Sequence, residues 1–317
     1  MPPATRSRSQ HGRQRRDPEE RLRRSRAAQD AAYEAARIVL ERAAARRDAA
    51  WRDAARANRR RALLVLSFPA SVGLVLLAVG VAVTPLLFVG AIWIVAWTGM
   101  ALALWARTPA SLLAEMQGLT PANAVAAGIL RAVDAERLMD LSEGMCAVLG
   151  LPLPQLRVLP DDAPNALVVG RRHEDAVLVV TIGLVNLLGR IEMEAVIAHE
   201  LAHVKRLDIV TGTLSTTTLG QLVCSLGGAR STNWLLGSHR EIGADLAGVA
   251  TTRYPPGLIG ALERLREVPD PRPASLGDDV MRRTAPNWLV PPRRAGASDI
   301  APSADALEER LEVLREL

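Results

Sequence analysis

The chain has 317 residues, 49% of them hydrophobic, and carries 39 basic and 34 acidic side chains for a formal net charge of +5. This composition excludes an intrinsically disordered polymer and gives enough length for a full catalytic domain with additional segments. Its two cysteines, Cys146 and Cys224, are too few for a disulfide framework and stand in no thiol-ligand spacing, which excludes a disulfide-stapled scaffold.

The basic charge is concentrated in residues 1–61, which hold 18 Arg against 8 Asp or Glu. Asp17 and Pro18 predict a helix start, and no Gly or Pro interrupts the chain from there to residue 61. Charge runs of this kind are usually solvated, so we predict a cytoplasmic helical stalk over 1–61. Anionic lipid is the favoured partner of the stalk, because three arginines at 59–61 adjoin an apolar segment. Nucleic acid is the less favoured partner.

Residues 62–106 contain no Asp, Glu, Lys, Arg or His. About 20 apolar residues cross a bilayer, so this segment predicts a transmembrane hairpin with crossings at 62–83 and 86–106. A buried core hairpin is the alternative, but a soluble domain would have to cover the whole uncharged run. Basic residues flank both ends of the hairpin, which predicts a multi-pass protein of the cell (inner) membrane with both ends in the cytoplasm.

Residues 107–317 have the composition of a globular domain. Thr120-Pro121 predicts the start of a helix that runs with 3.6-residue apolar periodicity to Gly150. Three short stretches rich in Val and Leu follow, and they predict strands near residues 155–159, 165–170 and 175–181.

The chain is helical again from residue 183. Residues 209–229 are uncharged, but their threonines and glycines make a poor membrane span, so we favour a helix buried in the domain or lying at the interface. Residues 269–302 are loop-like and 306–317 form a closing amphipathic helix. The fold class is therefore α+β and mainly helical, with a small β-sheet.

The motif with the clearest chemistry is His199-Glu200-Leu201-Ala202-His203. Residues four apart lie on one face of a helix, so His199 and His203 can offer two imidazoles to one Zn²⁺. Glu200 lies about 100° around the helix, where its carboxylate can act as a general base without binding the metal. This spacing is typical of metal-assisted hydrolysis.

A catalytic zinc requires a third protein ligand and an open position. Glu241 is the candidate, and Asp245, one turn further on, is placed to accept the outer N–H of a ligating histidine. Asp208 and Asp245 are the next places to look for the third ligand, and a cysteine ligand is the less favoured chemistry. We expect one Zn²⁺ per chain.

Several further segments resemble the membrane zinc metallopeptidases that include the heat-shock protease HtpX and the CAAX prenyl protease. The resemblance covers about residues 138–317, in a series of short motifs: Gly150-Leu151-Pro152-Leu153-Pro154, Pro164-Asn165-Ala166-Leu167 with Gly170, Val179-Val180-Thr181, His199-Glu200-Leu201-Ala202-His203, Glu241 with Ala244-Asp245, and Leu307-Glu308-Glu309-Arg310. In that family two further crossings separate the motif from the third ligand, whereas Glu241 here lies 38 residues after His203.

The resemblance implies a zincin-type metallopeptidase domain over 107–317, with His199, His203 and Glu241 as ligands and Glu200 as base. It also implies that an extended substrate pairs along the strand edge at Asn165, Ala166 and Gly170. The predicted function is a membrane-anchored zinc endopeptidase that acts on protein or peptide substrates at the cytoplasmic face.

The alternative function is a non-catalytic, membrane-tethered binding protein that uses its basic stalk. The presence of Glu200 favours the enzyme, because a purely structural metal site has no use for a carboxylate that binds no metal. His239, Arg240 and Tyr254 are candidates for stabilising the oxyanion, because they lie near Glu241 in the sequence.

Overall fold

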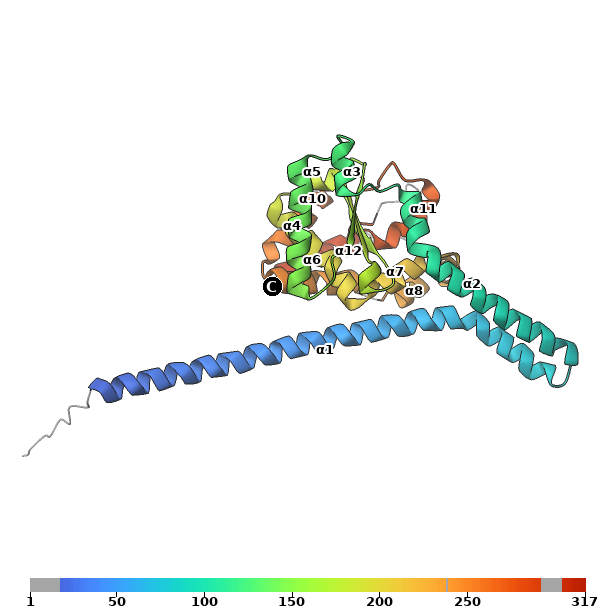
Figure 1. Ribbon diagram of the computed structural model, residues 1–317, viewed down its shortest axis with the longest axis horizontal. Helices are drawn as coiled ribbons and strands as arrows, with labels where there is room; N and C mark the ends of the chain where they lie inside the picture. The colour runs from blue at the N-terminus through green and yellow to red at the C-terminus, as the bar shows by residue number, and fades with distance from the viewer. Residues whose placement is uncertain (1–17, 238, 292–303) are drawn as a thin grey trace, which may run out of the picture. The chain divides into compact units, whose positions relative to one another are not determined.

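The computed structural model describes residues 18–237, 239–291 and 304–317 (Figure 1). The chain divides into two compact units, residues 1–50 and residues 51–317. In the first unit, helix α1 begins at Pro18, as predicted, while its expected N-cap Asp17 lies outside the described residues. Arg37 there forms ion pairs with Glu34 and Glu41, one turn away on either side.

Helix α1 spans Pro18–Gly80, so the expected stalk and the first crossing form one helix. The second unit begins at Trp51, whose side chain is only 8% exposed and belongs to the buried core with Ala62 and Val65. Lys205 Nζ lies 5.4 Å from the centre of the Trp51 ring, a cation–π distance. Residues 51–61, which the sequence assigns to the stalk, therefore pack within the second unit.

The apolar hairpin consists of the end of α1 and helix α2 (Thr84–Met116), with a turn at 81–83. Among the described residues, two helical segments are long and apolar enough to cross a membrane, Glu41–Gly80 and Thr84–Ala103. Their side chains are largely exposed, with Phe68 at 70% and Phe88 at 68%. Such a surface is unsuited to water, which argues against a buried core hairpin.

Close packing joins the two arms of the hairpin. A Cβ atom on Gly90 would lie 2.8 Å from the Gly73 carbonyl oxygen, so glycine permits this approach. The indole N–H groups of Trp93 and Trp97 donate to the backbone oxygens of Pro69 and Leu66. These bonds satisfy polar groups that a bilayer cannot hydrogen-bond.

The helix predicted from Thr120 to Gly150 is interrupted. The structure has α3 (Pro121–Ala126) and α4 (Ala132–Leu149), with Gly128 between them at a φ of +71°. Because this left-handed conformation ends a helix, the apolar periodicity alone overestimated its length. The predicted end at Gly150 is confirmed, with a φ of +62° at this cap.

The three predicted strands are confirmed as β1 (Gln155–Leu159), β2 (Ala166–Val169) and β3 (Val177–Thr181). Their order is β1-β3-β2, with β1 parallel and β2 antiparallel to β3. Side chains on the two faces of the sheet enter two separate hydrophobic clusters. Burial of both faces explains the nearly continuous apolar composition of these strands.

Helix α6 carries the histidine motif and packs against helices that precede it and helices that follow it in the sequence. The helices and 3-10 turns that complete the unit are η1 (His173–Asp175), α5 (Ile182–Leu187), α6 (Arg190–Arg206), α7 (Asp208–Ser215), α8 (Thr218–Leu236), α9 (Arg240–Thr252), α10 (Pro255–Arg266), α11 (Asp278–Thr284), η2 (Ala285–Asn287) and α12 (Ala304–Arg315). Helix α6 contacts α4, α9 and α10. It therefore lies in the core of the second unit.

Two sequence expectations need correction in this region. The uncharged segment 209–229 forms two helices rather than one, because the chain turns at Thr216 and Thr217 between α7 and α8. All eight residues of α7 are buried, so this part lies inside the domain. The expected loop at 269–302 contains α11 and η2, while residues 292–303 lie outside the described part of the chain.

Deleting residues 2–50 should leave the midpoint of thermal unfolding in detergent unchanged, since this deletion spares the second unit. Extending the deletion to residue 57 removes Trp51 from the core and should lower the free energy of unfolding by about 3–5 kcal/mol. Circular dichroism melts of the two truncated proteins measure the difference. Equal melting of both would show that Trp51 does not contribute to the stability of the unit.

Candidate active site

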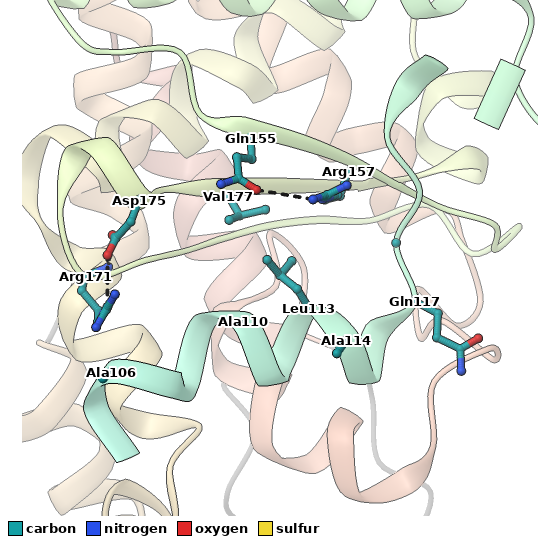
Figure 2. Close-up of a pocket in the computed structure, with 11 residues that line it drawn as sticks. Ala106, Ala110, Leu113, Ala114, Gln117, Gln155, Arg157, Arg171, Asp175 and Val177 are labelled. Atoms are coloured by element: carbon teal, nitrogen blue, oxygen red, sulfur yellow. Dashed lines mark hydrogen bonds and ion pairs between the residues drawn. The ribbon is translucent and has the colours of Figure 1, made fainter. Parts of the chain in front are cut away.

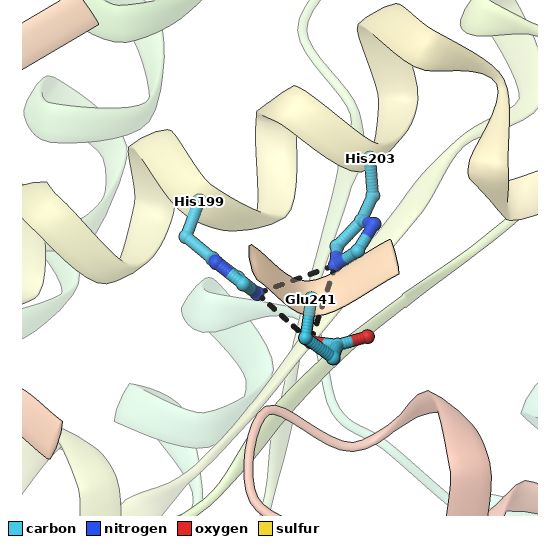
Figure 3. Close-up of side chains that lie close together, drawn as sticks. All are labelled: His199, His203 and Glu241. Carbon is cyan, nitrogen blue, oxygen red and sulfur yellow. Dashed lines mark hydrogen bonds and ion pairs between the residues drawn. The ribbon is translucent and has the colours of Figure 1, made fainter. Parts of the chain in front are cut away.

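Two histidines project from one face of α6. His199 and His203 are one turn apart and almost fully buried, and their Nε2 atoms lie 3.2 Å from each other (Figure 3). Their rings meet edge to face, at an interplanar angle of 87°. The two nitrogens therefore converge on one point beside the helix.

Glu241, at the start of α9, completes a triangle with these nitrogens. Its Oε2 atom lies 3.4 Å from His199 Nε2 and 3.5 Å from His203 Nε2. Tetrahedral zinc with bonds near 2.0–2.1 Å requires its ligand atoms to be about 3.3 Å apart. The three atoms therefore have the spacing of one face of a zinc tetrahedron, and they form the cluster that could hold a metal ion.

Glycine at position 248 lets α9 approach α6 closely. A Cβ atom there would lie 3.0 Å from the backbone nitrogen of His199, which is tighter than ordinary side-chain contacts allow. Helices α6 and α9 make the most extensive contact between any two elements of the second unit. This contact brings Glu241 within reach of the histidines.

Glu200 is buried beside the triangle, with 1% of its surface exposed. Neither of its carboxylate oxygens has a hydrogen-bond partner among the described residues. Burial raises the pKa of Glu200, although the nearby His199 and His203 oppose the shift. Buried carboxylates are normally paired. Glu200, unpartnered beside a cluster that could hold a metal ion, is therefore suited to accept a proton.

The outer nitrogens of both imidazoles face carboxylates. His199 Nδ1 lies 2.7 Å from Asp245 Oδ1, and His203 Nδ1 lies 3.1 Å from Asp208 Oδ2. Carboxylates at these positions fix the tautomer and orientation of a ligating histidine. Asp245 thus lies where the sequence spacing put it, whereas Asp208, considered as a possible third ligand, contacts the side of His203 that faces away from the triangle.

Arg310, on the last helix, holds Asp245 in place. Its Nε and Nη2 atoms donate to the two oxygens of Asp245 at 2.7 and 2.8 Å, and its Nη1 donates to the Leu289 carbonyl. Burial opposes ionisation of both partners, but their mutual charge and hydrogen bonds lower the pKa of Asp245 and raise that of Arg310. Sequence reasoning did not assign Arg310, whose only signal was its place in a shared family motif.

Charges around the triangle also perturb its own groups. Burial opposes protonation of His199, but the charge of Asp245, 2.7 Å from Nδ1, outweighs this effect and raises the pKa of His199 to about 9. Despite partial burial, the charges of His203 and Arg240 hold the pKa of Glu241 well below its usual range. With a pKa of about 9, His199 carries the extra proton at neutral pH when no metal is bound. Because metals bind the neutral imidazole, binding of a metal to His199 would release that proton.

Of the three oxyanion candidates, only Arg240 is buried. Its Nη1 atom donates to the Pro286 carbonyl at 3.0 Å and lies 3.5 Å from Glu241 Oε1. Its Nε atom has no hydrogen-bond partner among the described residues. His239 and Tyr254 are exposed, Tyr254 to 50%. Of the three candidates, the structure therefore places only Arg240, a buried cation, next to the cluster.

The residues of the expected substrate edge are fully buried and engaged in other hydrogen bonds. The Asn165 amide donates to the carbonyls of Pro271 and Val290. The Ala166 carbonyl accepts from Leu289 N–H. Both backbone groups of Gly170 bond to the Thr213 hydroxyl. Substrate pairing along this edge would require these partners, including the segment 288–290, to move, and the edge stays a prediction.

A separate groove of about 600 Å³ lies between α2 and the strands β1 and β3 (Figure 2). Leu113 of α2 lies on one side of it, Gln155 and Val177 lie on the other, and the paired Arg171 and Asp175 lie at one end. None of the residues of the triangle lines this groove. It is therefore distinct from the candidate metal cluster.

Comparison with known proteins gives a family. The family model described as peptidase family M48 matches residues 132–268. The chain is 30% identical over 212 residues to a protease HtpX homolog of Dictyoglomus thermophilum, covering 56% of this chain and 68% of that protein. It is also 30% identical over 211 residues to a protease HtpX homolog of Salinibacter ruber, covering 58% of this chain and 75% of that protein. No solved structure matches the chain.

The mainly helical fold, the apolar hairpin and these matches define a membrane metallopeptidase. The chain belongs to peptidase family M48, the family of HtpX. Peptidases of this family are in general zinc-dependent, and the His-His-Glu cluster has donor types and spacing that fit this metal.

Replacing Arg310 with alanine should lower the free energy of unfolding by about 3–5 kcal/mol, because Asp245 is left buried without its counter-charge. Arg315→Ala is the matched control, since this residue on the same helix forms a half-exposed pair with Glu263. Arg315→Ala should lower the free energy of unfolding by less than about 1 kcal/mol. Denaturant unfolding measures both, and equal losses would contradict a structural role for the Arg310–Asp245 pair.

Proposed function

We propose that the chain is a membrane-anchored, HtpX-like zinc endopeptidase that hydrolyses peptide bonds of protein substrates at the cytoplasmic face. The observation that carries this proposal is the triangle of His199, His203 and Glu241, with atoms 3.2–3.5 Å apart beside an unpartnered Glu200. Membership of family M48 supports it.

In this proposal His199, His203 and Glu241 hold one Zn²⁺, which supplies Lewis-acid polarisation of the scissile carbonyl and activation of water. Glu200 accepts a proton from the attacking water and delivers it to the leaving amine. Asp245 and Asp208 keep the imidazoles oriented through Nδ1.

Arg240 is our candidate for stabilising negative charge on the carbonyl oxygen. It is a buried cation next to Glu241, where its field is screened less than at the surface. Its two hydrogen bonds to the segment 286–287 hold the guanidinium in place.

The cytoplasmic location is inferred from charge. Three arginines at 59–61 precede the first span, and Arg107 follows the second, which favours the cytoplasm for both ends. The arginine-rich first unit would then lie at the inner surface of the membrane, where anionic lipid can attract it.

Glu200→Gln should keep zinc near stoichiometric while hydrolysis of casein falls by roughly 10²–10⁴-fold, because the amide keeps the shape but accepts no proton. His199→Ala should instead lose zinc. Metal analysis of the purified proteins, alongside turnover, separates the two effects. Wild-type turnover in Glu200→Gln would contradict its role as base, and a zinc-loaded wild type that cleaves no peptide would favour the non-catalytic alternative.

A reporter enzyme that is active only outside the cytoplasm should give no signal when fused to either terminus. The same reporter inserted in the turn at 81–83 should be active, because this turn would lie outside, between the two spans. A signal from the C-terminal fusion would place the metallopeptidase domain on the opposite side of the membrane and contradict the proposal.

A further inference from the structure

Asn58 is a buried polar residue on the face of α1 that packs into the second unit. The residues of this face recur at spacings of four and three, in the order Trp51, Ala55, Asn58, Ala62 and Val65. The other four belong to the hydrophobic core or pack against it, whereas Asn58 is 3% exposed and carries an amide. A single polar residue in such an apolar stripe costs stability and commonly fixes the register of helix packing.

The amide of Asn58 is held from both of its ends. Its Nδ2 atom donates to Asp208 Oδ1 and, at 3.3 Å, to the carbonyl of Arg206. Its Oδ1 atom accepts from Arg61 Nη1 at 3.0 Å. Because nitrogen faces a carboxylate and oxygen faces a guanidinium, only one orientation of this amide satisfies every partner.

Asp208 links this amide to the candidate metal site. Its Oδ1 atom accepts from Asn58, while its Oδ2 atom faces His203 Nδ1 at 3.1 Å and accepts from Arg206 Nε at 2.9 Å. Asp208 is 2% exposed, so no solvent replaces a lost partner. Asn58 therefore limits rotation of the carboxylate that orients the His203 ring, and His203 Nε2 forms one corner of the triangle.

We propose that Asn58 is a positioning residue of the metal site, acting on His203 through Asp208, and that the docked membrane helix α1 is thereby part of this site. The inference rests on the proposed zinc function of the His-His-Glu triangle. It extends that function to a residue 150 positions away from Asp208 in sequence, on the helix that continues into the bilayer.

The first test compares Asn58→Leu with Trp51→Ala in the full-length protein in detergent. Zinc affinity is measured by competition with a chelator, and the absorption spectrum of the Co²⁺-substituted protein reports ligand geometry. Asn58→Leu should weaken zinc binding about tenfold and shift the cobalt spectrum. Tenfold is the lower end of the loss in affinity that follows removal of a hydrogen-bond partner behind a metal ligand. Trp51→Ala should lower the melting temperature while leaving affinity and spectrum unchanged.

Wild-type affinity and spectrum in Asn58→Leu would overturn the proposal. Equal losses of affinity in both variants would overturn it too, because they would reflect general undocking of α1. If the wild type itself binds no zinc, the proposed function fails instead, which is a different result.

A double-mutant cycle tests the route and remains usable if Asn58→Leu does not fold, because it uses Asn58→Ala. In the wild-type background Asn58→Ala should weaken zinc binding, but in an Asp208→Ala background it should have no further effect. Additive losses would show that Asn58 does not act through Asp208 and would overturn the inference.

Discussion

Helix α9 packs closely on α6, and this crossing determines the geometry of the candidate metal site. Gly248 permits this contact, and at this crossing two imidazole nitrogens and a carboxylate oxygen come within 3.2–3.5 Å of one another. Bringing a carboxylate against two buried imidazoles is unfavourable unless charge is balanced, so the surrounding helices must compensate. The sheet and the remaining helices can be understood as the support for this one crossing.

Compensation comes from two parallel arrangements of aspartate and arginine. Asp245 contacts His199 Nδ1 and is paired with Arg310. Asp208 contacts His203 Nδ1 and is paired with Arg206. The first arrangement ties the closing helix α12 to the site, and the second lies where α6 ends and α7 begins. Asn58 adds the membrane helix to the second arrangement. Elements from both ends of the chain thus meet at the same cluster.

Local patterns predicted much of this molecule, and long-range pairs were missed. The uncharged run 62–106 and the three apolar strands are continuous in sequence, so hydropathy and periodicity found them. The spacing of the histidine motif likewise brought His199 and His203 to one helix face. The partnership of Arg310 with Asp245 spans 65 residues and that of Asn58 with Asp208 spans 150, and no local periodicity reports either. The break at Gly128 was missed because apolar spacing continues across it.

In the proposed site, two imidazoles and a carboxylate bind one zinc ion. X-ray absorption spectroscopy at the zinc edge of the stoichiometrically loaded, full-length protein measures this coordination. We expect a four-coordinate shell of nitrogen and oxygen at about 2.0–2.1 Å, with the outer scattering of two imidazoles and no sulfur. A sulfur shell at about 2.3 Å, which would require Cys146 or Cys224, or a spectrum without imidazole, would contradict it.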